Sequence, residues 1–229
     1  MRSSFNAFGQ SKKLYDAGSV PVWLGTVTAV PVGGTLPSAF VKKDALYPAG
    51  TPICLDGKTI TPLVAFVVVS YTAATTGDYD TIVIKPCTYG GVDFIPTAND
   101  MLQKLGANFA ATGKAAKVVA VTALTGDDAG KYEFTVDKTA NLGSLSANDI
   151  LVFSASATAG TSKAMANQPN AYLFNDIFIG DIDPSLEGAG ASGAAVKMHA
   201  EGILINRTPA ADFKAAMAAA VPGVVQVNY

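Results

Sequence analysis

Residues 172–207 read YLFNDIFIGDIDPSLEGAGASGAAVKMHAEGILINR, and this stretch organises the fold that the sequence predicts. Its first segment, 172–182, is apolar on both faces, which is typical of a strand that lies between other elements. After the loop, the side chains alternate between two faces with the two-residue period of a half-buried strand. One face carries Val196, Met198, Ala200 and Leu204, and the other carries Lys197, His199, Glu201 and Ile203.

The loop between these two strands, Pro184–Gly193, is mostly Gly, Ala and Ser. Such a segment buries little apolar surface to offset the entropy of ordering it, so we expect it to project and move. A rigid sheet that carries an exposed loop indicates a surface-binding module rather than a catalytic cleft.

The first half of the chain predicts a series of short strands. The ordered body begins at Val22–Val30, where side chains alternate. A short strand at Ile53–Leu55 ends at Asp56-Gly57, a strong signal for a tight turn. The run Leu63–Val69 is apolar and rich in β-branched residues, which favours a central strand. Another strand follows at Thr81–Pro86, after a polar loop.

One short helix is expected at Thr97–Leu105. Thr97 is a plausible N-cap, Asp100 stands three residues later as in a capping box, and Gly106 follows the last helical residue.

Residues 107–160 are expected to form an inserted small β subdomain. Strands at 117–124 and 132–136 flank the Gly- and Asp-rich segment 125–131, which predicts a hairpin. Asp149–Phe153 supplies a third strand, and a polar linker, 158–169, leads back to the core.

The chain ends in a second helix and a last strand. Pro209 suits the first turn of a helix, Asp212 suits its positive N-terminal end, and Pro222-Gly223 stops it. The last residues, 224–229, are expected to form an edge strand or a tail that pairs with another element. At the other end, residues 1–20 form an N-terminal arm that is either disordered or becomes ordered on a neighbour.

These elements predict a mainly β fold with two short helices. We expect a β-sandwich or barrel-like core domain built from 21–106 and 161–229, with the β-rich insert between the two parts. Charged residues make up only 15% of the 229 residues, against about a quarter in typical globular proteins. A surface with so few charges suits a protein that packs against copies of itself or partners. The net charge of -2 and the lack of a basic stripe argue against nucleic-acid binding.

Two cysteines, Cys54 and Cys87, lie in apolar runs and are expected to be buried free thiols. The first residues lack the apolar core of a secretory signal, and the longest apolar run is too short to span a bilayer. We therefore expect synthesis and folding in a cytoplasm, without a membrane anchor.

The sequence suggests no catalytic, cofactor or metal site. His199 is the only histidine, and no nucleophile motif accompanies it, so we expect an ordinary strand residue. The pairs Asp181/Asp183 and Asp127/Asp128 lack the spacing of a strong calcium site, and turn chemistry explains the second pair. Five aromatic residues are candidates for a sugar site, although such residues more often lie in cores and interfaces. They are Trp23, Tyr71, Tyr79, Tyr89 and Phe94.

Four stretches resemble head-decoration, auxiliary capsid and head-fibre proteins of tailed bacteriophages. They are Pro48–Gly57, Asn175–Asp183, Ser192–Arg207 and Pro209–Val227. The resemblance covers the first-half strands and the last sixty or so residues, but not the arm or the insert. It implies a structural protein with no catalytic residues, located on the exterior of the capsid and often trimeric.

The resulting expectation is a virion protein that bridges or stabilises capsomers, either as decoration or cement or as the base of a head fibre. Its partners would be the major capsid protein and further copies of itself in a homotrimer. In the head-fibre case, a further fibre protein would be a partner as well. The alternative is a carbohydrate- or host-surface-binding fibre module, which the exposed loop and the tyrosines favour. An enzyme that acts on glycans is the third and least favoured class.

Overall fold

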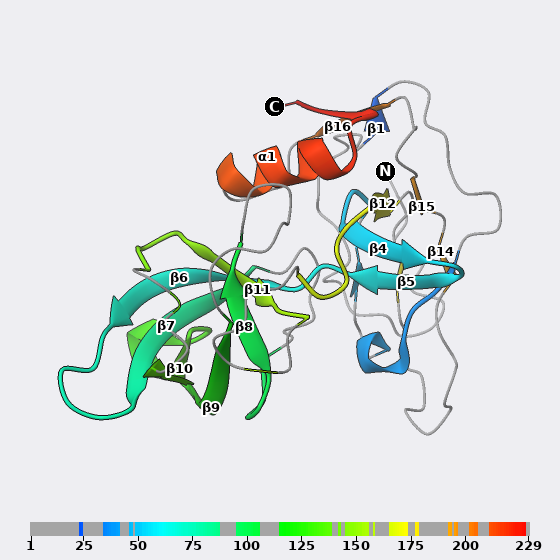
Figure 1. Cartoon of the computed structure of the whole chain (residues 1–229). Coiled ribbons are helices and arrows are strands. Elements are labelled where there is room, and N and C mark those ends of the chain that lie inside the picture. Colours follow the sequence, from blue (N-terminus) through cyan, green and yellow to red (C-terminus); the bar gives the residue numbers. More distant parts are fainter. Residues whose placement is uncertain are drawn as a thin grey trace.

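The computed structural model describes residues 23–24, 34–41, 46–47, 49–87, 95–105, 115–138, 142, 145–155, 158, 165–173, 177–178, 192–193, 195–196, 202–205 and 211–227. In this part of the chain the protein is mainly β, as the sequence predicts, and it contains one α-helix. Figure 1 shows two β units side by side, with the helix lying over the barrel. The expected N-terminal arm, 1–20, lies outside the described residues.

The first unit is a closed barrel of six antiparallel strands in the order β10-β7-β6-β11-β8-β9. The strands are β6 (Ala65–Thr72), β7 (Tyr79–Cys87), β8 (Met101–Lys104), β9 (Ala116–Ala123), β10 (Tyr132–Asp137) and β11 (Ile150–Phe153). Because the ladder closes, each strand pairs on both sides and the barrel has no open edge.

Alternating apolar residues fill the barrel. Phe66 lies edge-to-face against both Phe134 and Phe153, with ring centroids 5.8 Å apart in each pair. Such aromatic pairs add about 0.5–1.5 kcal/mol beyond the burial of their area. The pairing register shifts between Val68 and Ser70 and between Thr135 and Val136, which marks a bulge in each ladder. Bulges strengthen the local twist that a small barrel needs.

The second unit is a six-stranded sheet in the order β14-β2-β5-β4-β12-β15. Its strands are β2 (Gly34–Thr35), β4 (Pro52–Asp56), β5 (Thr59–Pro62), β12 (Ala171–Leu173), β14 (Ser192–Gly193) and β15 (Ala195–Val196). The two outermost strands, β14 and β15, are separated by one residue in sequence. Consecutive Cα atoms are only about 3.8 Å apart, so this sheet must curve until its two edges approach each other.

One tight turn and one side-chain contact shape the second unit. The hairpin between β4 and β5 turns at Gly57, whose φ of +56° suits a residue without a Cβ, as the Asp56-Gly57 signal predicts. Asn170 acts as an extra rung beside β4: its side-chain amide accepts the Leu55 N–H at 2.8 Å and donates to the Leu55 carbonyl at 3.0 Å.

A third sheet of three strands, in the order β1-β16-β17, carries the helix. It consists of β1 (Trp23–Leu24), β16 (Gly202–Ile205) and β17 (Val224–Val227), with α1 (Ala211–Ala220) as the crossover between the parallel pair β16 and β17. The buried residues Ala216 and Met217 of α1 pack in one cluster with Ile150 and Val152 of β11. The helix therefore covers the outer wall of the barrel at β11 (Figure 1). A small two-stranded sheet joins β3 (Leu46–Tyr47) to β13 (Ile177–Phe178), and a 3-10 turn, η1, spans Ser38–Phe40.

Several expectations are confirmed. The hairpin around 125–131 is β9 and β10, the strand expected at 149–153 is β11, and the last strand is β17 at the edge of its sheet. The C-terminal helix is α1, which ends at Ala220, two residues before Pro222 of the stop signal Pro222-Gly223.

The helix expected at Thr97–Leu105 is wrong. The Asp100 carboxylate does accept the Thr97 N–H at 2.7 Å, but this bond closes a turn in which Asn99 has a φ of +80°. The chain then enters β8, where Leu102 is fully buried between the strands β9 and β11. Burial in the barrel overrides a local capping signal worth only about 1 kcal/mol.

Strand pairing crosses the expected boundary between residues 106 and 107. The strands β9, β10 and β11 from the predicted insert close the barrel with β6, β7 and β8 from the predicted core. The two segments expected to form a hairpin in 172–207 are likewise divided among sheets. Tyr172 does pair with Val196 across β12 and β15, but β13 and β16 belong to other sheets. Of the loop Pro184–Gly193, the described residues are 192–193, in β14.

Candidate functional site

The outer face of the barrel across β6, β7 and β10 carries hydroxyl and carboxylate side chains and one exposed tyrosine. Thr81 of β7 pairs with Thr72 of β6 on one side and with Thr135 of β10 on the other. In the next row, Val83 pairs with Ser70 and Glu133. We call this surface the hydroxyl face; it consists of Ser70, Thr72, Tyr79, Thr81, Val83, Glu133, Thr135 and Asp137.

The hydroxyl face points outward because its residues alternate with buried ones along each strand. On β7, the intervening residues Asp80, Ile82 and Ile84 are buried, and on β10 the same holds for Phe134 and Val136. Tyr79, which pairs directly with Asp137, is 52% exposed. An aromatic side chain that fills no core therefore stands beside a carboxylate at one end of the face.

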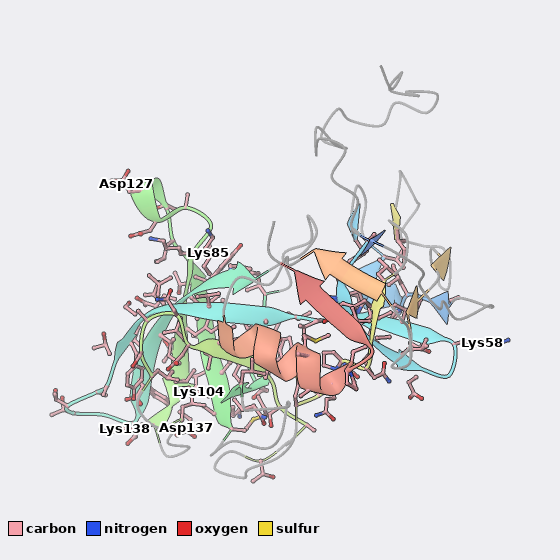
Figure 2. The ribbon with its side chains drawn as sticks, turned by 90° about the horizontal axis from the view of Figure 1, so that it is seen from above. Lys58, Lys85, Lys104, Asp127, Asp137 and Lys138 are labelled. Carbon is pink, nitrogen blue, oxygen red and sulfur yellow. The ribbon has the colours of Figure 1, made fainter. Side chains whose placement is uncertain are left out.

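A set of hydrogen bonds fixes the loop that joins β6 to β7 beside this face. The Asp80 carboxylate is 7% exposed and accepts the Tyr71 hydroxyl and the Ala74 N–H, each at 2.8 Å. Lys138 donates its backbone N–H to the Asp78 carbonyl at 2.8 Å and its Nζ to the Ala74 carbonyl at 2.6 Å. The loop is thus tied to β7 and to the end of β10. Figure 2 shows Asp137 and Lys138 on the barrel, remote from Lys58 in the other unit.

The environment of Tyr71 keeps its hydroxyl protonated. Burial, the hydrogen bond to Asp80 and the charge of Asp80 together raise the pKa of Tyr71 to about 12. Because the protonated form is the one that donates to Asp80, this bond persists throughout the neutral pH range.

A pocket of about 250 Å³ lies between the two β units. Its lining comes from η1 and the end of β5 on one side and from Phe153 and the segment Met165–Asn167 on the other. Most of these side chains are apolar, so the pocket offers contact area but few groups that would orient a ligand.

The structure places the sugar-site candidates differently from one another. Tyr71 packs against the barrel core and donates to Asp80, so its hydroxyl is already engaged. Tyr79 is exposed. Trp23 lies in β1 and its side chain is not described, while Tyr89 and Phe94 lie outside the described residues.

The remaining candidate residues either lie outside the described residues or are explained by local structure. His199, Asp181 and Asp183 fall outside the described residues. Asp127 and Asp128 lie in the 3-10 turn η3 (Gly126–Asp128), where Asp128 accepts Lys131 Nζ at 2.6 Å, so turn chemistry accounts for them. In the described part of the chain, no three metal-ligating side chains gather. There, too, no helix has the length and hydropathy of a membrane span.

Cys54 is a free thiol, as expected, but it is half-buried rather than buried. Burial, followed by the negative charge of Asp56, raises the pKa of this thiol. Its thiolate, the nucleophilic form, is therefore scarce at neutral pH. The side chain of Cys87 is not described.

Sequence reasoning named Tyr79 but missed its companions on the hydroxyl face. Glu133 and Thr135 alternate with apolar residues along 132–136, and Thr81 is followed by the apolar run Ile82–Ile84, so the pattern would have placed Glu133 and Thr135 on one face of their own strand. Their meeting depends on the register between strands, and the bulge after Val68 shifts that register by one residue. No local pattern reports such a shift.

No protein-family model matches this chain, and no significantly similar protein was found among curated proteins or solved structures.

Proposed function

We propose that this chain is a structural virion protein on the outer face of a tailed-phage capsid. It would bridge or stabilise neighbouring capsomers, as a decoration or cement protein or as the base of a head fibre. Its partners would be the major capsid protein and further copies of the chain, with a homotrimer as the expected assembly. In the head-fibre case, a further fibre protein would dock on this base.

The observation that carries the proposal is the closed construction of the barrel. All six strands pair on both sides, and their ladders enclose a core of tightly packed aromatic and aliphatic side chains. A closed barrel cannot slip in register or add strands at an edge, so its outer surface keeps one shape. A protein that holds shell subunits at fixed distances needs a stiff body of this kind.

The chemistry of the chain supports the same role. Charged residues are few, and the net charge is close to zero. A protein on the outside of a shell has no use for a basic surface, since packaged DNA lies inside. Many copies, each contributing one standard-sized contact of about 1,600 Å², would add up to a large stabilisation of the shell through avidity.

Two of the stretches that carry the resemblance to phage proteins correspond to defined elements. Pro48–Gly57 contains β4 and the turn into β5, and Pro209–Val227 contains α1 and β17. Each contains regular secondary structure with buried residues, namely Ile53 in the first and Ala216, Met217 and Val224 in the second, so the resemblance includes residues of the core.

The test is cryo-electron microscopy of purified particles that carry this chain, together with mass spectrometry of their proteins. The proposal expects density for the six-stranded barrel on the outer shell, at a copy number set by capsid symmetry. Density confined to the tail or the lumen, or absence of the chain from mature heads, would refute it.

A second test examines the stabilising role itself. Particles that lack the protein are heated with and without the purified full-length chain, and release of their DNA is followed with a dye. Added protein should raise the release temperature in a saturable way. No binding to such particles would contradict the bridging role.

A further inference from the structure

Tyr79 is the most exposed of the large apolar side chains in the described part of the chain, at 52%, compared with 37% for both Val69 and Val119. It stands at the first position of β7, where its backbone is paired in register with Asp137. Tyrosine combines an apolar ring with a polar hydroxyl, so an exposed ring on a paired strand offers a ligand both kinds of contact.

The surroundings of the ring are rich in hydrogen-bonding groups. Asp137 lies opposite Tyr79, and the row formed by Thr72, Thr81 and Thr135 comes next along the strands. Glu133 supplies a second carboxylate two residues further along β10. The hydroxyl face therefore combines an aromatic plane, hydroxyls that both donate and accept, and two strong acceptors.

This surface is formed in advance of binding. The Asp80 carboxylate and the Lys138 bonds to Ala74 and Asp78 fix the adjoining loop, and the ladders on both sides fix β7. A ligand would consequently pay little entropy for ordering the protein.

We propose that the hydroxyl face is a binding site for a neutral oligosaccharide, with Tyr79 as its stacking platform. A sugar ring has an apolar face of C–H groups and a rim of hydroxyls. The Tyr79 ring takes the C–H face, while carboxylate and threonine oxygens accept hydrogen bonds from the rim. Hydrogen bonds to charged acceptors are about twice as strong as neutral ones, which gives Glu133 the main orienting role.

The composition of the face distinguishes this ligand from other classes. The core of a protein–protein interface is depleted in Ser, Asp and Glu, which are the residues found here around Tyr79. Lys85, the next outward residue of β7 after Val83, offsets one of the two carboxylates, so the face and its border carry little net charge. A neutral glycan fits both facts.

The experiment uses the purified full-length chain and four neutral probes: maltotetraose, cellotetraose, chitotetraose and mannotetraose. Binding is measured by calorimetry and by amide chemical shifts. At least one probe should bind and shift the amides of β7 and β10. Tyr79→Ala should weaken that binding by about tenfold, the equivalent of one typical stacking contact, whereas Tyr79→Phe should keep most of it. Glu133→Gln should weaken it less, since the amide oxygen still accepts.

The matched control is Val119→Ala on β9, another exposed apolar residue of the barrel that is not part of the hydroxyl face, and it should leave binding unchanged. Circular dichroism confirms that each variant is folded. The proposal falls if none of the four probes binds, if binding survives Tyr79→Ala, or if Tyr79→Ala instead abolishes self-association in sedimentation experiments. These measurements need no virion, so they stand or fall separately from the proposed location on a capsid.

Discussion

The close approach at Gly34 gives a prediction whose size follows from the structure. A Cβ added to Gly34 would lie 2.7 Å from the Lys58 carbonyl oxygen and 2.6 Å from Cγ1 of Ile60. Real Cβ atoms essentially never come so near to another heavy atom, so something must move. Ile60 is fully buried in the core of the second β unit, and the Lys58 carbonyl accepts the Thr35 N–H at 2.7 Å.

We expect Gly34→Ala to lower the free energy of unfolding by about 2–3 kcal/mol. Overpacking against Ile60 costs about 1–3 kcal/mol. Displacement of the Lys58 carbonyl weakens one backbone hydrogen bond, worth about 1 kcal/mol. Alanine lowers the conformational entropy of the unfolded chain relative to glycine, and this effect offsets about 0.4–1 kcal/mol of the loss. Because the obstacle includes backbone, side-chain rearrangement alone cannot relieve it.

The measurement is urea denaturation followed by circular dichroism, with Ser38→Ala as the control, since that nearby side chain is exposed. A double-mutant cycle with Ile60→Ala separates the two contacts. Removing the Ile60 side chain should recover part of the Gly34→Ala cost but not the part due to the Lys58 carbonyl. A Gly34→Ala chain within about 0.5 kcal/mol of the natural one, the range of ordinary surface substitutions, would refute the reasoning.

Three further predictions concern other contacts. Asn170→Ala should lower the free energy of unfolding by about 1–3 kcal/mol, because the Leu55 N–H and carbonyl lose their partner; unchanged urea midpoints would contradict this. Folding raises the pKa of Tyr71 from 10.0 to about 12, so the stabilisation present below pH 10 is lost as the pH rises from 10 to 12. Urea midpoints should fall over that window, less steeply in Tyr71→Phe, and equal slopes would count against the assignment. In a Cys87→Ala chain, Cys54 should react slowly with a disulfide reagent at pH 7 and faster as the pH passes the ordinary thiol range, because burial and Asp56 raise its pKa; a fast reaction at pH 7 would show that the thiolate is already present.

Several elements could be predicted because their signals are local. The β9–β10 hairpin follows from alternation on either side of a Gly- and Asp-rich turn, and the β4–β5 turn follows from Asp56-Gly57. The helix α1 follows from an alanine-rich run closed by Pro222-Gly223. In each case the residues that specify the element are neighbours in the chain.

The error at β8 shows where such signals fail. Thr97 and Asp100 do make the local contact that the capping pattern predicts. The same contact occurs in a tight turn as well as in a helix. The next residues form a strand that pairs with two others, 116–123 and 150–153. The choice between helix and strand was therefore made by partners far away in sequence.

The sequence by itself determined that the chain folds into β-structure with weakly charged surfaces, because strand and turn propensities and composition are properties of short segments. Only the tertiary structure decided that strands from 65–104 and 116–153 share one barrel and that β14 and β15 form the two edges of the second sheet. It also brought Tyr79 beside Asp137 and aligned the three threonines. The physical reason is that strand order and register are set by the packing of the whole core, and a shift of one residue would turn every one of these side chains to the other face.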